Sequence, residues 1–156
     1  MFNIAIFGRP NVGKSTLFNA LVRKKKAIVS NVSGVTVDRN YGIVKLNDIS
    51  FKLIDTAGIL DKALHKNEFT VQTLKAIEEA DLVFFVTDYS SGILPYDFEL
   101  SSILRKTKKN VIHLVNKFDA KNNVFSDKDA IKIGFREIIY ISSDHKKGFD
   151  DIYNSL

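Results

Sequence analysis

The chain has 156 residues, of which 45% are hydrophobic and 26% are charged, a composition typical of one domain with a full core. It contains no cysteine, which excludes a disulfide framework and thiol chemistry. The apolar runs are too short to cross a bilayer, so we expect a cytoplasmic protein with no stable membrane association. The net charge is +5, and we expect the protein to be a monomer.

Strands and helices are predicted to alternate along the chain. Hydrophobic periodicity predicts strands near residues 3–7, 40–46, 49–55, 82–88, 110–116 and 138–142. It predicts helices near residues 14–22, 68–79, 96–106, 127–132 and 149–156. Asn47 and Asp48 lie between two strand-like runs and predict a tight hairpin turn. This order indicates an α/β fold with a six-stranded, mostly parallel sheet, one antiparallel edge strand and helices on both faces.

A glycine-rich loop joins the first predicted strand to the first predicted helix. The loop and the residue after it are Gly8, Arg9, Pro10, Asn11, Val12, Gly13, Lys14, Ser15 and Thr16. The pattern G-x-x-x-x-G-K-S predicts backbone N–H groups that surround a phosphate at a helix start. Lys14 is predicted to reach the β- and γ-phosphates, and the Ser15 hydroxyl to hold Mg²⁺. A chance glycine turn is the alternative, but the strand before and the helix after favour a phosphate-binding loop.

A second polar segment ends the predicted strand 49–55. It consists of Asp55, Thr56, Ala57 and Gly58. An aspartate at the carboxyl end of a strand is placed to hold Mg²⁺ through water. Gly58 is predicted to bring its N–H against a γ-phosphate and to let the next segment move when that phosphate leaves. An ordinary strand-to-loop turn is the alternative, which the phosphate loop upstream disfavours.

A third segment, after the predicted strand 110–116, has the residues needed to recognise a base. Asp119 is predicted to accept hydrogen bonds from N1–H and the exocyclic amine of guanine, and adenine has no such amine. Asn116 is predicted to contact the base and to connect neighbouring loops, while the Lys117 stem lies over the ring. The loop after the last predicted strand adds Ser142, Ser143 and Asp144, whose N–H groups are predicted to meet the guanine O6. Polar strand-to-helix turns are the alternative for both segments.

Thr36 is the candidate for a third Mg²⁺ ligand. It lies in the segment 33–39, between the first predicted helix and the hairpin, which has no strong periodic pattern. This suits a mobile switch that senses the γ-phosphate. A surface-loop threonine is the alternative.

The three histidines do not predict a metal site. His113 lies within an apolar run and is predicted to be a packed core residue, and His65 lies in a charged stretch. His145 follows the predicted base-binding loop. None has a partner at the spacing of metal ligands.

In this order the motifs resemble the translation-factor-like class of P-loop GTPases, from Phe2 to about Ile152. At the level of individual residues, the motifs resemble the first G domain of the Der (EngA) family of bacterial ribosome-assembly GTPases. The resemblance is carried by GRPNVGKSTLFNALV, GVTVDRNYG, LIDTAGI, EEADLVFFVTD and VNKFD.

The resemblance implies a P-loop NTPase fold, hydrolysis of GTP to GDP and phosphate, Mg²⁺ dependence and a role in maturing the large ribosomal subunit with its rRNA. It implies that Lys14, Thr36, Gly58 and Asn11 take part in catalysis, the last through a K⁺ ion. Local capping by Asn11 is the alternative. Ile59 stands where Ras-like enzymes have a water-orienting glutamine. Because family members carry two G domains and a KH-like domain, we expect residues 1–156 to form a single G domain, the other two domains being absent from this chain.

Two further hypotheses stay open. The first is a nucleotide-gated RNA or protein interaction module that hydrolyses little alone. Basic clusters at 23–26, 105–109 and 146–147 fit either an RNA-facing surface or solvated helix ends. The second is an adenine-nucleotide kinase or ATPase, which the segment 116–119 disfavours.

Overall fold

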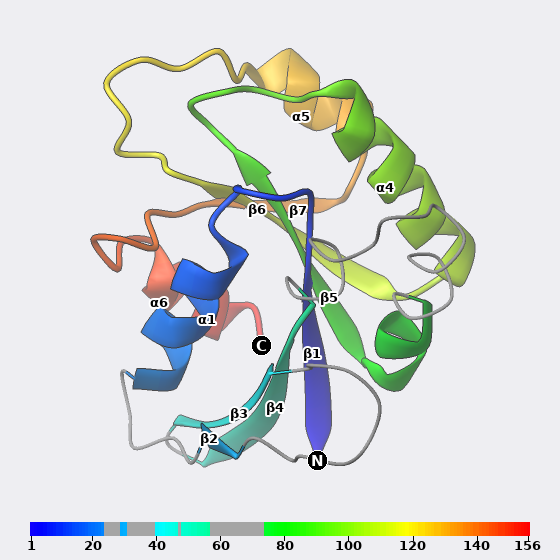
Figure 1. The fold of residues 1–156 in the computed structure, drawn as a ribbon, viewed down its shortest axis with the longest axis vertical. Coiled ribbons are helices and arrows are strands. Elements are labelled where there is room, and N and C mark those ends of the chain that lie inside the picture. The colour runs from blue at the N-terminus through cyan, green and yellow to red at the C-terminus, as the bar shows by residue number, and fades with distance from the viewer. Residues whose placement is uncertain (24–28, 31–39, 47, 57–73) are drawn as a thin grey trace.

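A seven-stranded sheet forms the centre of the computed structural model, which describes residues 1–23, 29–30, 40–46, 48–56 and 74–156 (Figure 1). The strands are β1 (Phe2–Phe7), β2 (Val29–Ser30), β3 (Asn40–Leu46), β4 (Ile49–Asp55), β5 (Leu82–Asp88), β6 (Asn110–Asn116) and β7 (Glu137–Tyr140). Across the sheet they follow the order β2-β3-β4-β1-β5-β6-β7. The strands from β4 to β7 in this order are parallel, and β3 runs antiparallel to β4.

The predicted fold class is confirmed, with one strand added. The six predicted strands correspond to β1 and β3–β7, and the two-residue strand β2 pairs with the outer side of β3. Two residues cannot establish a periodicity of two, so no sequence pattern could predict β2. The β3–β4 hairpin pairs Leu46 with Ile49 where the tight turn was predicted. Asn47 itself lies outside the described residues.

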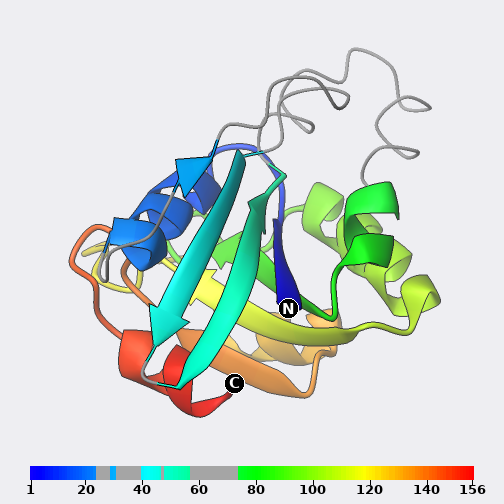
Figure 2. The ribbon, with the colours of Figure 1, turned by 90° about the horizontal axis from the view of Figure 1, so that it is seen from below.

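Helices cover both faces of the sheet (Figures 1 and 2). They are α1 (Lys14–Arg23), α4 (Pro95–Thr107), α5 (Asp127–Ile133) and α6 (Phe149–Asn154), and residues 74–79 are also helical. Helices α1 and α6 lie on one face, whereas α4, α5 and residues 74–79 lie on the other. Only the end of the predicted helix 68–79 falls within the described residues. Among the helices that the structure describes, none is long and apolar enough to span a membrane.

The central strand β1 supplies both halves of the core. Ile4 and Ile6 pack with α1 and α6 on one face, while Ala5 and Phe7 pack beneath α4 on the other. All four side chains are buried because a central strand of a two-faced sheet has no solvent side. The register places Asp55 beside Ile6 and Asn116 beside Asp88, so the carboxyl ends of these strands meet at one edge of the sheet. Ligands of such sheets bind at this edge.

Candidate functional site

The loop between β1 and α1 has the backbone shape that its two glycines permit. A Cβ at Gly8 would lie 2.5 Å from the carbonyl oxygen of Val86, so the loop passes too close to β5 for any side chain. Gly13 has φ +97°, a conformation that side-chain-bearing residues rarely adopt. Its missing Cβ leaves room for the amide of Asn116. The chain then enters α1, with the Leu17 N–H donating to the Gly13 carbonyl at 2.9 Å.

Lys14 and Ser15 begin α1 beside the end of β4. The buried Lys14 ammonium donates to the carbonyl oxygens of Gly8 and Arg9, each at 2.7 Å. The Ser15 hydroxyl lies 3.3 Å from Oδ2 of the buried Asp55. A hydroxyl and a carboxylate are brought together from two distant segments, and both are oxygen ligands of the kind that Mg²⁺ prefers. The next residue, Thr56, is also buried and donates to the Ile6 carbonyl at 2.6 Å, which fixes the end of β4 against β1.

Asn116 connects the phosphate loop to the loop after β7. Its Nδ2 donates to the Val12 carbonyl at 2.9 Å. Its Oδ1 accepts from both the backbone N–H of Ser143, at 3.0 Å, and the Ser143 hydroxyl, at 2.9 Å. All of these groups are buried, so the bonds are made away from competing water. The amide therefore joins the phosphate loop to the loop after β7.

Lys117 makes a second connection to the phosphate loop. Its backbone is left-handed, with φ 63°, and its ammonium donates to the carbonyl of Asn11 and to Oδ2 of Asp88, both at 2.9 Å. Asp88 also accepts from the N–H and hydroxyl of Ser90. Although burial acts to raise the pKa of Asp88, these hydrogen bonds and the Lys117 charge lower it overall. The carboxylate therefore stays charged and holds the ammonium in place.

Asp119 presents an ionised carboxylate near this network. Its side chain is 30% exposed, and its pKa is lowered, first by a hydrogen bond from the Ser142 side chain. A carboxylate in the charged form only accepts hydrogen bonds, and its two oxygens can face two adjacent N–H donors. Nε2 of His145 lies 3.0 Å from Oδ2 of Asp119.

Arg9 fixes the phosphate loop to the start of α4. Its Nε donates to Oδ2 of Asp97 at 3.1 Å, and a terminal nitrogen donates to the Ser91 hydroxyl at 2.6 Å. Asp97 is fully buried, which raises its pKa, and from the first turn of α4 it also accepts from the N–H of Leu94, the residue that precedes the helix. Arg9 therefore points away from the loop interior, into a buried ion pair beneath α4.

The remaining predicted site residues are exposed, partly buried or outside the described residues. Asn11 is exposed, with φ 68°, and Thr16 is exposed on the first turn of α1. Pro10 is partly buried, and Asp144 is exposed in the loop after β7. Four predicted residues lie outside the described residues: Thr36, Ala57, Gly58 and Ile59.

Sequence reasoning missed the side chains that support the site. Asp88, Ser91, Asp97 and His145 contact predicted site residues, yet none was predicted as a site residue, although Asp88 ends the motif EEADLVFFVTD. The terminal aspartate of a buried strand, which made Asp55 a candidate, could also have singled out Asp88. Asp97 accepts from the N–H of the N-cap residue Leu94, whose apolar side chain cannot cap the helix and gives no capping signal in the sequence.

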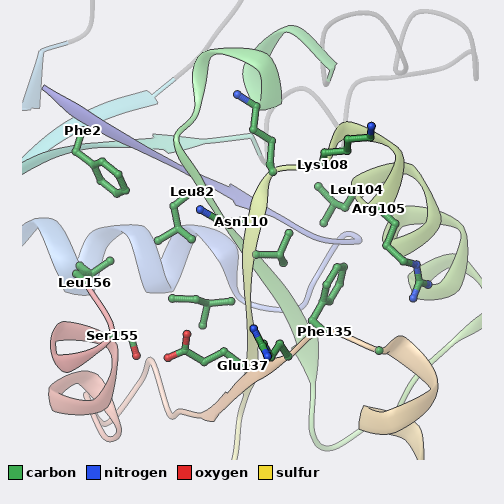
Figure 3. A pocket seen from close by; sticks show the side chains of 15 residues that line it. Phe2, Leu82, Leu104, Arg105, Lys108, Asn110, Phe135, Glu137, Ser155 and Leu156 are labelled. Carbon is green, nitrogen blue, oxygen red and sulfur yellow. The ribbon is translucent and has the colours of Figure 1, made fainter.

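A separate pocket lies at the amino ends of the parallel strands, away from these loops (Figure 3). It has a volume of about 530 Å³ and a lining of polar and apolar residues, among them Phe2, Leu82 and Phe135. Arg105 and Lys108 contribute positive charge to its wall. No predicted site residue lines this pocket.

The doubly covered sheet, its phosphate loop and the polar strand ends around that loop define a P-loop GTPase domain. A model of the family described as 50S ribosome-binding GTPase matches residues 3–117, and the chain belongs to this family. It is accordingly a guanine-nucleotide-binding domain of the GTPase class.

Curated proteins named GTPase Der are similar to this chain over almost its whole length. GTPase Der of Mycoplasma mycoides subsp. mycoides is 42% identical over 154 residues, covering 98% of this chain and 35% of that protein. GTPase Der of Rickettsia rickettsii is 47% identical over 154 residues, covering 98% of this chain and 34% of that protein. The chain thus spans about a third of the length of these relatives. The predicted resemblance to the G domain of Der is confirmed.

Solved structures share the fold at lower identity. A crystal structure of an Era variant from Aquifex aeolicus bound to GDP·AlF4⁻ has a TM-score of 0.74 and 28% identity, covering 98% of this chain and 55% of that one. The G domain of the T. maritima FeoB iron transporter has a TM-score of 0.74 and 26% identity, covering 99% of this chain and 95% of that one.

Proposed function

We propose that residues 1–156 form a single G domain that hydrolyses GTP to GDP and phosphate with Mg²⁺ and acts as a nucleotide switch in the assembly of the large ribosomal subunit. The observation that carries the proposal is the junction of the phosphate loop with the base-recognition segment, where Nδ2 of Asn116 donates to the Val12 carbonyl at 2.9 Å. Membership of the GTPase family and the names of the Der relatives support it.

The phosphate loop would hold the triphosphate. Gly8 and Gly13 allow the loop a path that residues with a Cβ could not follow, and backbone N–H groups of such a loop can meet phosphate oxygens. Lys14, at the start of α1, adds a positive charge to that of the helix N-terminus. Phosphoryl transfer depends mainly on such positioning and charge stabilisation.

Ser15, Asp55 and Thr36 would hold the Mg²⁺ ion. The first two fit this role because their oxygens lie 3.3 Å apart beside the phosphate loop. The bound ion would supply positive charge to the β- and γ-phosphates. Gly58 would bring its backbone N–H against the γ-phosphate. Since the Ile59 side chain offers no hydrogen bond, another group would orient the attacking water.

Asp119 would select guanine over adenine. Its ionised carboxylate accepts two hydrogen bonds, and a nucleotide without the matching donors would leave it unpaired. Lys117 would cover the base with its stem. The N–H groups of Ser142, Ser143 and Asp144 would face the guanine O6.

The substitution Asp119→Asn tests the guanine assignment. An asparagine amide donates to the extra carbonyl of xanthine but repels the guanine amine, so we expect GTP affinity to fall about 10- to 100-fold and XTP affinity to rise. Titration of both nucleotides into both proteins measures the change. The exposed acid Asp150, on α6, provides the control: Asp150→Asn should leave the base preference as it is. An unchanged preference in Asp119→Asn contradicts the assignment.

Asn11 would contribute to catalysis by holding K⁺ against the phosphates. Its side chain is exposed at the crest of the loop, and its left-handed backbone is one that asparagine tolerates. We expect GTP turnover to be faster in K⁺ than in Na⁺ at equal ionic strength. Asn11→Ala should abolish the difference. Equal rates of the unmodified protein in the two salts would rule out the K⁺ role.

A further inference from the structure

His145 makes a contact with the candidate guanine-recognition carboxylate that no motif explains. Its Nε2 lies 3.0 Å from Oδ2 of Asp119, and the two residues come from the loops after β7 and β6. The His145 side chain is 59% exposed, so packing does not force it into this position. The contact is therefore specific to the carboxylate.

The loop that carries His145 is itself fixed. Ser142 and Lys147 close it through a pair of backbone hydrogen bonds of 3.0 and 3.1 Å. The His145 N–H lies 3.3 Å from the Ser142 hydroxyl, inside this closed turn. Ser142 also hydrogen-bonds the Asp119 carboxylate through its side chain. Asp119 is thus held from one side by two residues of a single turn.

Such a hold leaves the carboxylate able to bind a base. Each carboxylate oxygen has two acceptor positions, so Oδ2 can accept from an imidazole and from a second donor together. The χ2 torsion of an aspartate is broad, and a 30% exposed side chain has room to rotate about it. A donor on one oxygen narrows that rotation and presets the plane of the carboxylate. Binding is stronger when the recognition group is already ordered.

We propose that His145 is a positioning residue for guanine recognition, which holds Oδ2 of Asp119 through Nε2 and orients the carboxylate for the edge of the base. The inference rests on the guanine-selecting role proposed above for Asp119. Protonation of the imidazole turns the hydrogen bond into an ion pair and strengthens the hold. Guanine nucleotide binding then depends on the charge of His145.

The charges around this pair allow that dependence to be isolated. Lys147 acts on the Asp119 carboxylate from the same turn, and Asp144 and Lys146 flank His145 in the chain. Because the pKa of Asp119 is lowered, first by the Ser142 hydrogen bond, the carboxylate stays ionised between pH 6 and pH 8.

Calorimetric titration of GDP at pH 6 and pH 8 tests the proposal on the 156-residue chain. The ratio of variant to unmodified Kd is taken at each pH, so that titration of the nucleotide itself cancels. We expect His145→Ala to raise the Kd about three- to tenfold at pH 6 and by less than about threefold at pH 8. His145→Gln, which keeps a donor without a charge, should bind like the unmodified chain at pH 8 and more weakly at pH 6.

Lys146→Asn is the matched control. It removes one positive charge from the same turn, and asparagine tolerates the left-handed backbone at φ 54°. Its Kd ratio should stay near one at both pH values. Three results for His145→Ala overturn the proposal: no change, an equal change at both pH values, or tighter binding. If Asp119→Asn switches the base preference while His145→Ala leaves the Kd of GDP unchanged, the positioning role of His145 is wrong and the guanine-selecting role of Asp119 stands.

Discussion

His113 is a titratable side chain that is buried in the sheet and takes no part in the candidate site. Its side chain is fully buried on β6, as the sequence predicted, among the rings of Phe85, Phe125 and Phe135. Nε2 lies 2.8 Å from the Thr87 hydroxyl, and burial lowers the pKa of His113 to about 4. The imidazole is neutral in the folded protein at neutral pH. Folding therefore competes with protonation as the solution becomes acidic.

This competition predicts a loss of stability in acid. The folded pKa, about 4, lies below the ordinary value of 6.5, so the unfolded chain binds more protons between these values. The unfolding free energy should fall by about 3 kcal/mol as the pH drops through this window, from this residue alone. The double variant His113→Phe and Thr87→Val should lack that part of the loss. Urea unfolding at pH 7 and pH 4 measures it, and Thr87→Val alone, which keeps the imidazole, should retain it.

At the scale of elements, long apolar runs and motifs with fixed residue types gave correct predictions. The strands β1, β4, β5 and β6 are largely apolar runs that end in glycine or polar residues, and the phosphate loop has a strict glycine pattern. Each of them lies where it was predicted. The connections between elements were harder. The pair of Arg9 with Asp97 joins residues 88 positions apart in the chain, and no local pattern encodes that contact. The end of β7 was predicted two residues late because the bridge of Ser142 to Lys147 continues the extended chain.

The turn into α6 predicts a measurable difference between two glycines. Gly148 and Gly92 both have positive φ, +80° and +74°. A Cβ at Gly92 would meet the side chain of Val124 at 3.3 Å, which can shift, whereas a Cβ at Gly148 would clash with the backbone carbonyl of Tyr140. We expect Gly92→Ala to cost about 1–2 kcal/mol of unfolding free energy and Gly148→Ala more than about 3 kcal/mol. Equal losses in chemical denaturation would show that the carbonyl contact carries no energy.

At the scale of the whole molecule, the proposed nucleotide site and the basic cluster at 105–109 lie at opposite ends of the sheet. The site gathers at the carboxyl ends of β1, β4, β5 and β6, while Arg105 and Lys108 border the pocket at the amino ends (Figure 3). The net charge of +5 suits a polyanionic partner. In the proposed function, RNA that docks on the cluster at 105–109 would leave the nucleotide site uncovered. This separation also suits the alternative of a nucleotide-gated interaction module.

The rate of GTP hydrolysis in the presence of ribosomal particles distinguishes two hypotheses. One is a GTPase switch that a partner stimulates, and the other is an interaction module that hydrolyses little GTP. We expect GTP turnover in K⁺ to rise at least tenfold when large ribosomal subunits are added, since supply of a missing group is worth ~10³–10⁵ in related phosphoryl transfer. Stimulation should weaken as salt rises, because contacts with RNA release counterions. Lys106→Glu, at the exposed end of α4, should reduce stimulation while intrinsic turnover stays constant. Lys128→Glu makes the same charge change at an exposed position on α5 and should keep the stimulation. Turnover that is indifferent to the particles would favour the interaction module.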